Sequence, residues 1–254
     1  MFKRGVYYLI FVLTLFIPQA EANYHPADSL FKEGNKAYQE GDYNRAIDWY
    51  EQIIDSGIKN HQVYYNLGNA YFRENQLGRA IANYNLGLNL APRDEDILAN
   101  LQYIRLFVVD KVKEQSPNLL TENIDRILSF WTTSELSLIF TVSYFLFVLL
   151  LILWIFSRTK RVILNTVVII LLVVFVVSGV SFGLKLHNTS VVTKGVVVAD
   201  KVDIKSGPGE EWTSQFTAHQ GLELVIKGEA SGWYQIILPN QVIGWLPEKA
   251  VEKI

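Results

Sequence analysis

The sequence contains no cysteine, and this absence excludes several kinds of chemistry at once. Disulfides, thiolate zinc sites, thiol nucleophiles and iron–sulfur clusters all require cysteine. No phosphate loop and no dinucleotide fingerprint occur, and no two histidines have the H-x-x-x-H spacing of a metal site. We therefore predict a non-enzymatic protein with no catalytic residue, no metal and no cofactor.

A strong net charge is also absent. The formal charge is −2 over 254 residues, which gives no general attraction to nucleic acid. The length suffices for one large domain or for two to three small ones.

Two long stretches lack charge altogether. They are residues 136–156 and 162–184, and each has at least 20 residues. A helix needs about 20 apolar residues to cross ~30 Å of hydrocarbon. We therefore predict a transmembrane hairpin here, in preference to two buried core helices. Function is then to be sought in the soluble parts on either side.

The five-residue loop between the spans, residues 157–161, concentrates positive charge. Its charged residues are Arg158, Lys160 and Arg161. Positive residues in short loops stay cytoplasmic, so we expect both soluble parts outside the cytoplasm, at a bacterial inner membrane.

The N-terminus independently predicts the same topology. Lys3 and Arg4 precede an apolar run, residues 5–17, and Ala20-Glu21-Ala22 has a small–x–small pattern. These features are typical of a secretory signal, residues 1–22, cleaved after Ala22. An uncleaved anchor helix is the alternative, and it also carries the chain out of the cytoplasm.

Residues 27–114 match themselves at an offset of 34. The matching pairs include Gly34-Asn35 with Gly68-Asn69, Ala46-Ile47 with Ala80-Ile81, and Tyr50 with Tyr84. That period indicates helix–turn–helix units stacked in an all-α solenoid. The segment resembles the tetratricopeptide repeat family, with repeats at 27–60 and 61–94 and a capping helix from residue 95 through Val112. Gly41 and Asn75 are suited to the left-handed turns within the repeats.

The resemblance implies a concave groove, lined by the first helix of each repeat, that holds a peptide segment. The residues in groove-facing slots are Phe31, Asn35, Tyr38, Tyr65, Asn69, Phe72 and Arg73. A subgroup of the family grips a terminal carboxylate with basic residues beside two asparagines. Asn35 and Asn69 match its asparagine slots, whereas Phe31, Asp96 and Asn100 occupy its basic slots. We expect an aromatic, mostly neutral groove; solvation or packing within a repeat is the alternative for each residue.

Residues 115–135 link the repeats to the first span. Apolar residues within 119–130 have helical spacing, and Trp131, which favours a membrane interface, follows. Two positions remain open for this amphipathic helix, on the membrane surface or against the last repeat. Thr132 and Glu135 have capping-box spacing, which marks the start of the first span.

Two glycines of the second span, Gly179 and Gly183, form a G-x-x-x-G pattern. Small residues at this spacing let membrane helices touch. The same stretch also matches the hydrolase pattern G-x-S-x-G, which needs a strand–turn–helix context that a membrane helix does not provide. We predict helix packing here, against the first span or a partner's helix.

Residues 191–254 change to short strand-like stretches separated by turns. The motifs there are VDIKSGPG at 202–209, Gly221, GWY at 232–234 and GWL at 244–246. Their order and spacing resemble the bacterial SH3 domain. The resemblance implies a small all-β SH3-like barrel with a peptide-binding face near Trp212, Tyr234 and Pro208. A spacer or interdomain brace is the alternative role.

The complete order of signal, repeats, two spans and SH3-like domain resembles the BatE family of bacterial aerotolerance operons. The resemblance implies a role in cell-envelope integrity or in stress and oxygen tolerance. It also implies neighbouring proteins, namely a MoxR-type ATPase and membrane proteins with von Willebrand factor A domains. We expect a multidomain membrane scaffold that binds protein or peptide segments. A sensor that reads cell-wall peptidoglycan peptides through the SH3-like domain is the alternative.

Overall fold

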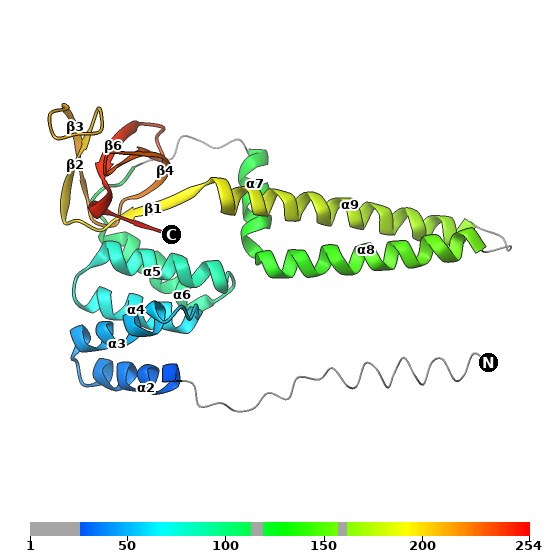
Figure 1. Ribbon diagram of the computed structural model, residues 1–254, viewed down its shortest axis with the longest axis horizontal. Helices are drawn as coiled ribbons and strands as arrows, with labels where there is room; N and C mark the ends of the chain where they lie inside the picture. The colour runs from blue at the N-terminus through cyan, green and yellow to red at the C-terminus, as the bar shows by residue number, and fades with distance from the viewer. Residues whose placement is uncertain (1–25, 113–118, 157–161) are drawn as a thin grey trace.

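The computed structural model describes residues 26–112, 119–156 and 162–254. Along the chain they form a helical solenoid, a short crossing helix, a long helical hairpin and an antiparallel sheet (Figure 1). The predicted signal peptide, with Ala22, and the loop with Arg158, Lys160 and Arg161 lie outside the described residues. The topology that these segments imply therefore stays a prediction.

The solenoid consists of five α-helices. They are α2 (Pro26–Gln39), α3 (Tyr43–Asp55), α4 (His61–Arg73), α5 (Leu77–Leu90) and α6 (Glu95–Ile104). Side chains of Asp42, Asn60 and Asp94 cap α3, α4 and α6 by accepting from backbone N–H groups of the first turn. Gly41 and Asn75 have positive φ angles of 81° and 58°. This confirms the two left-handed turns expected from the sequence.

Small residues permit the close helix packing within each repeat. A Cβ atom at Gly34 would lie 2.6 Å from a ring carbon of Tyr50, and one at Gly68 would lie 2.7 Å from Tyr84. Both tyrosines are fully buried. Since interiors are packed as densely as crystals, a methyl group at either glycine would displace a central ring of the core.

The capping helix ends earlier than expected. Helix α6 stops at Ile104, a short 3-10 turn, η1 (Arg105–Phe107), follows, and the chain does not continue as a helix to Val112. The last apolar face of the solenoid is covered instead by the sheet: Val196 and Ile254 belong to the same hydrophobic core as the repeats.

The hairpin consists of α8 (Thr133–Phe156) and α9 (Val162–Val191) and projects away from the other parts (Figure 1). Both helices are long and apolar enough to cross a membrane, and most of their side chains are exposed. The hydroxyl groups of Ser143 and Ser178 lie 3.1 Å apart between the helices. Phe140 stacks on Phe175 at 5.2 Å. The second helix extends beyond the predicted end of its apolar run at residue 184.

Helix α7 (Leu119–Phe130) crosses the base of the hairpin (Figure 1). Its Leu128 is buried, and the Leu128 carbonyl accepts a hydrogen bond of 3.0 Å from Nζ of Lys185 on α9. Ile124, Ile127 and Phe130 stay exposed. The apolar side of the linker helix is therefore left largely uncovered by protein.

The C-terminal part is a seven-stranded antiparallel sheet of order β3-β2-β6-β5-β4-β1-β7. The strands are β1 (Thr193–Val197), β2 (Lys201–Lys205), β3 (Ser214–His219), β4 (Glu223–Ala230), β5 (Trp233–Ile237), β6 (Ile243–Pro247) and β7 (Val251–Lys253). The order is open, so the closed SH3 barrel is not confirmed. The physical reason is that β7, which could have helped to close the sheet, packs against α5 of the solenoid.

The sheet and the solenoid share an intimate interface. A Cβ atom at Gly78 of α5 would lie 2.2 Å from the Val197 carbonyl oxygen of β1. Glu223 of β4 accepts hydrogen bonds of 2.9 and 3.0 Å from the Arg105 guanidinium and one of 3.0 Å from Asn85. The backbone N–H of His219 donates to the Asp110 carboxylate at 2.6 Å. These contacts favour the role of an interdomain brace for the sheet.

Candidate functional site: the groove of the solenoid

The first helix of each repeat presents a polar ladder built mainly from asparagine. Oδ1 of Asn35 accepts hydrogen bonds from the Tyr50 hydroxyl at 2.7 Å and from Nδ2 of Asn66 at 2.9 Å. One repeat later, Oδ1 of Asn69 accepts from the Tyr84 hydroxyl at 2.7 Å and from Nδ2 of Asn100 at 2.8 Å. The two sets are related by the 34-residue offset, so the repeat produces the same polar geometry twice.

The buried tyrosines fix the orientation of the two ladder amides. Burial raises the pKa of Tyr50 to about 12 and that of Tyr84 further still, so both phenols keep their protons and donate. Each donation occupies the amide oxygen of Asn35 or Asn69. The Nδ2 groups of Asn35 and Asn69 can then donate to a ligand. The backbone carbonyl groups of an extended peptide are suitable acceptors.

The ladder borders a small pocket of about 130 Å³. Its lining residues are Asn35, Tyr38, Gln39, Tyr50, Asn66 and Asn69. A pocket of this size admits a single side chain and no large ligand. The structure thus brings together three of the seven groove residues predicted from the sequence.

An aromatic strip continues the groove toward the end of the solenoid. The ring of Phe72 lies 6.0 Å from the rings of both Tyr103 and Phe107, which are themselves 5.1 Å apart. Tyr103 and Phe107 are 53% and 49% exposed. Both were missed in the sequence because the third repeat is incomplete. The same 34-residue offset relates Tyr103 to Asn69 and Phe107 to Arg73, and it would have located them.

The remaining predicted groove residues are partly engaged within the solenoid. Phe31 and Tyr65 are half-buried, with rings 6.0 and 6.3 Å from those of Tyr50 and Tyr84. Arg73 donates to the Tyr43 hydroxyl at 2.8 and 3.0 Å, and its guanidinium lies 5.1 Å from the centre of that ring. Arg73 is therefore held at the groove edge by an aromatic partner.

The peptide-binding face predicted on the sheet has a different character. Trp212 is 47% exposed and lies against Gly207, where a Cβ atom would come within 2.3 Å of the indole, next to Pro208. Tyr234, in contrast, is buried, and Nζ of Lys253 lies 4.5 Å from the centre of its ring. Of the two predicted aromatic residues of this face, Trp212 is the one that is open to a ligand.

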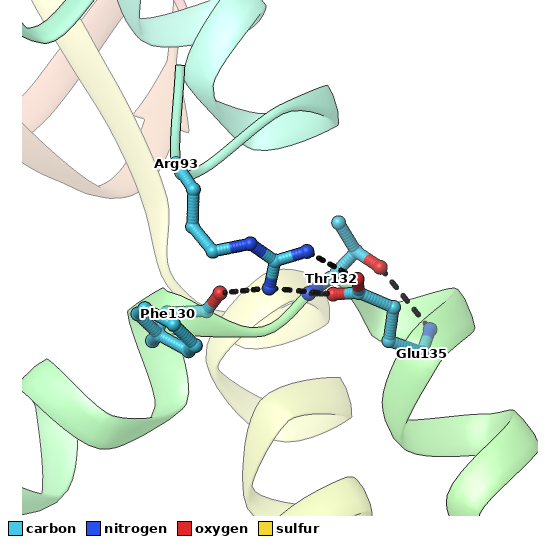
Figure 2. A network of polar contacts seen from close by, with 4 residues as sticks. All are labelled: Arg93, Phe130, Thr132 and Glu135. Atoms are coloured by element: carbon cyan, nitrogen blue, oxygen red, sulfur yellow. Dashed lines mark hydrogen bonds and ion pairs between the residues drawn. The ribbon is translucent and has the colours of Figure 1, made fainter. Parts of the chain in front are cut away.

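A polar joint connects the solenoid to the hairpin (Figure 2). Arg93, just before α6, donates to the Phe130 carbonyl at 3.0 Å and to the Glu135 carboxylate at 2.5 and 3.3 Å. The backbone N–H of Thr132 donates to Glu135 at 2.8 Å, and that of Glu135 donates to the Thr132 hydroxyl at 3.1 Å. These reciprocal bonds confirm the predicted capping box.

The charge of Arg93 also shapes the electrostatics of the joint. Its guanidinium, together with the backbone N–H of Thr132, neutralises and fixes the Glu135 carboxylate. Its guanidinium lies 5.0 Å from the ring centre of Phe130 and 5.7 Å from that of Trp131. The joint therefore attaches the solenoid to the start of α8.

Comparison with known proteins identifies the repeat. Residues 61–94 match the family model of the tetratricopeptide repeat. No curated protein matches the chain. The chain thus contains a tetratricopeptide repeat, a fold that is typically a non-enzymatic module for protein interaction.

Two solved structures of tetratricopeptide domains are similar to part of the chain. The Sgt2 tetratricopeptide domain of Aspergillus fumigatus has 27% sequence identity and a TM-score of 0.32, and the match covers 35% of this chain and 59% of that one. The first tetratricopeptide domain of human RPAP3 has 23% identity and a TM-score of 0.21, with 32% and 91% covered.

Proposed function

We propose that this protein is a membrane-anchored, non-enzymatic scaffold that holds an extended protein segment in the groove of its solenoid. The observation that carries the proposal is the repeated asparagine ladder. Its fixed amides offer two donors one repeat apart, and the exposed rings of Tyr103 and Phe107 add apolar area beside them. The amides would bond the main chain of the peptide, and the aromatic rings would contact its side chains. We therefore expect an uncharged peptide with apolar side chains.

Anchoring is supported by the composition of α8 and α9 and by the chemistry at their base. The exposed apolar side chains of α7 lie next to Phe130 and Trp131, residues suited to a membrane interface. We propose that the hairpin crosses a bacterial inner membrane and that both soluble parts lie outside the cytoplasm. The groove then faces envelope proteins, and a Bat-type complex with von Willebrand factor A domain proteins is the partner set implied by the family resemblance.

A photo-crosslinking experiment in native membranes tests the groove. A photoreactive amino acid replaces Tyr103 in one variant and Gln52, exposed on the second helix of the first repeat, in a matched control. We expect a discrete crosslinked protein from position 103, lost when Asn35 and Asn69 are both changed to alanine, and none from position 52. Equal yields from both positions would contradict groove binding.

The captured protein also tests the partner set. Recovery of a membrane protein with a von Willebrand factor A domain supports a Bat-type complex, and recovery of other envelope proteins leaves the scaffold but removes that partner. The wall-binding alternative predicts instead that retention on purified peptidoglycan depends on Trp212. The groove proposal predicts that Trp212→Ala leaves crosslinking at position 103 unchanged.

A further inference from the structure

A second pocket, of about 600 Å³, lies where α5, α7, the end of α9 and the start of β1 meet. It is distinct from the groove pocket, because the two share no lining residue. Its polar lining includes Asn85, Asn89, Arg126, Ser129, Lys185 and Lys194. The volume is within the range of about 300–1,000 Å³ that is usual for small-ligand pockets.

The side chains of the pocket carry an excess of positive charge. Among the described residues, the pocket is lined by Arg126, Lys185 and Lys194 together with one acidic side chain, Asp125. Partial burial acts on the Lys185 ammonium group, and the charge of the neighbouring Lys194 adds to that effect. Lys185 is also held in place by its hydrogen bond to the Leu128 carbonyl. A bound anion would be attracted by the three cationic side chains of the pocket, one of which is held in place.

The position of the pocket indicates the source of the anion. Lys185 directly follows the uncharged run of the second span. On α7, Arg126 and Ser129 line the pocket, whereas Ile124 and Ile127 are exposed on another side of the helix. An amphipathic helix with that arrangement lies at the depth of lipid headgroups. Cationic side chains at this depth are complementary in charge to anionic headgroups.

We propose that this pocket binds the phosphodiester headgroup of an anionic phospholipid. The cations neutralise the phosphate, and the Asn89 amide bonds the polar part of the headgroup. The Asn85 amide and the Ser129 hydroxyl already donate within the protein, so their oxygen atoms accept from headgroup hydroxyls. The proposal rests on the membrane anchoring proposed above. Its consequence is that the lipid would sit between the solenoid and the hairpin and help to hold the two together.

The test uses the full chain in nanodiscs of phosphatidylcholine with a minority of phosphatidylglycerol. Lipids that stay bound after transfer to mild detergent are counted by native mass spectrometry. The variant is Lys185→Gln with Lys194→Gln. Lys194→Gln alone serves as a second variant that keeps the bond from Lys185 to α7. The charge-matched control is Lys201→Gln with Lys227→Gln, two exposed lysines of the sheet outside the pocket.

We expect the wild type and the control to retain phosphatidylglycerol selectively. The double variant should lose that selectivity roughly 10-fold or more, and Lys194→Gln about fivefold. Unchanged selectivity in both pocket variants would overturn the proposal, and so would displacement of the bound lipid by free glycerol phosphate, which would indicate a soluble ligand. Carbonate extraction reports insertion separately: an extracted chain refutes the anchoring, whereas an inserted chain without lipid selectivity refutes only the pocket.

Discussion

Glu252 makes the interface between sheet and solenoid sensitive to pH. It lies on β7 and is largely buried against the solenoid, where Arg79 of α5 and Glu51 of α3 act on it. Tyr71 of α4 donates to the Glu51 carboxylate and accepts from the Arg79 guanidinium at 3.3 Å. Burial raises the pKa of Glu252 to about 7, with repulsion from Glu51 adding to the rise and Arg79 opposing it.

The sign of the effect follows from the direction of the shift. Between the ordinary carboxyl pKa of 4.5 and the folded value of about 7, the folded chain holds a proton that the unfolded chain has released. The free energy of unfolding therefore falls as pH rises through that window and is level on either side. Since one pH unit corresponds to about 1.4 kcal/mol, an ionised Glu252 costs the folded chain roughly 3 kcal/mol. Between pH 5 and pH 8 the expected loss is about 2 to 3 kcal/mol.

The assay is urea unfolding of the detergent-solubilised full chain at pH 5 and pH 8, followed by near-ultraviolet circular dichroism of the aromatic residues. The variant is Glu252→Gln, which keeps the shape and removes the charge. Because other groups also titrate, the informative quantity is the difference in unfolding free energy between variant and wild type. We expect the variant to be more stable by roughly 3 kcal/mol at pH 8 and by less than about 1 kcal/mol at pH 5. A difference that is the same at both pH values would show that the carboxyl group is hydrated and that the interface is open.

Three further changes test other contacts. Gly78→Ala should lower the free energy of unfolding in urea by about 1 to 3 kcal/mol, because the new methyl group meets the Val197 backbone. The control is Gly228→Ala, whose Cβ atom would meet only Gln235 at ordinary contact distance. Equal effects of the two substitutions would contradict the close approach of α5 to β1. Arg93→Gln should broaden the distance distribution between spin labels on α5 and α8, because it removes the hydrogen bonds to the Phe130 carbonyl and the Glu135 carboxylate. The control is Arg45→Gln, an exposed arginine of α3 outside the joint, which should leave the distribution narrow. A narrow distribution in Arg93→Gln would refute the joint. Asn69→Ala should lower the free energy of unfolding by about 1 to 3 kcal/mol, because it removes the acceptor of the buried Tyr84 hydroxyl. Adding Tyr84→Phe to Asn69→Ala removes the unpaired hydroxyl and should restore part of that loss. A double variant no more stable than Asn69→Ala alone would argue against this bond.

The repeat architecture could be predicted because its determinants are local and recur. Gly34 with Tyr50 and Gly68 with Tyr84 occupy equivalent slots, and the structure shows each glycine directly against its tyrosine ring. The Thr132–Glu135 capping box is equally local, since both partners lie within one helical turn. Such features depend on spacing along the chain, which a sequence displays directly.

The contacts that assemble the modules could not be predicted in this way. Arg105 and Glu223 are 118 residues apart, and Arg93 and Glu135 are 42 apart. Each is an ordinary surface residue type whose partner depends on how whole elements dock. Closure of the sheet failed as a prediction for the same reason. The strand motifs are local, but the partner of an edge strand is decided by what else packs there, and in this chain it is the solenoid.

The joint and the interface together constrain how the groove would sit above the membrane that the hairpin is proposed to cross. The solenoid is fixed to the start of α8 through Arg93 and to the end of α9 through β1, which continues from that helix into the sheet. Both ends of the hairpin are thus attached to one body made of solenoid and sheet (Figure 1). A single attachment would let the groove rotate freely about it. Two attachments on adjacent helices restrict rotation about the hairpin axis, so a segment bound in the groove would be presented at a set height and direction, as a scaffold requires and a simple tether does not.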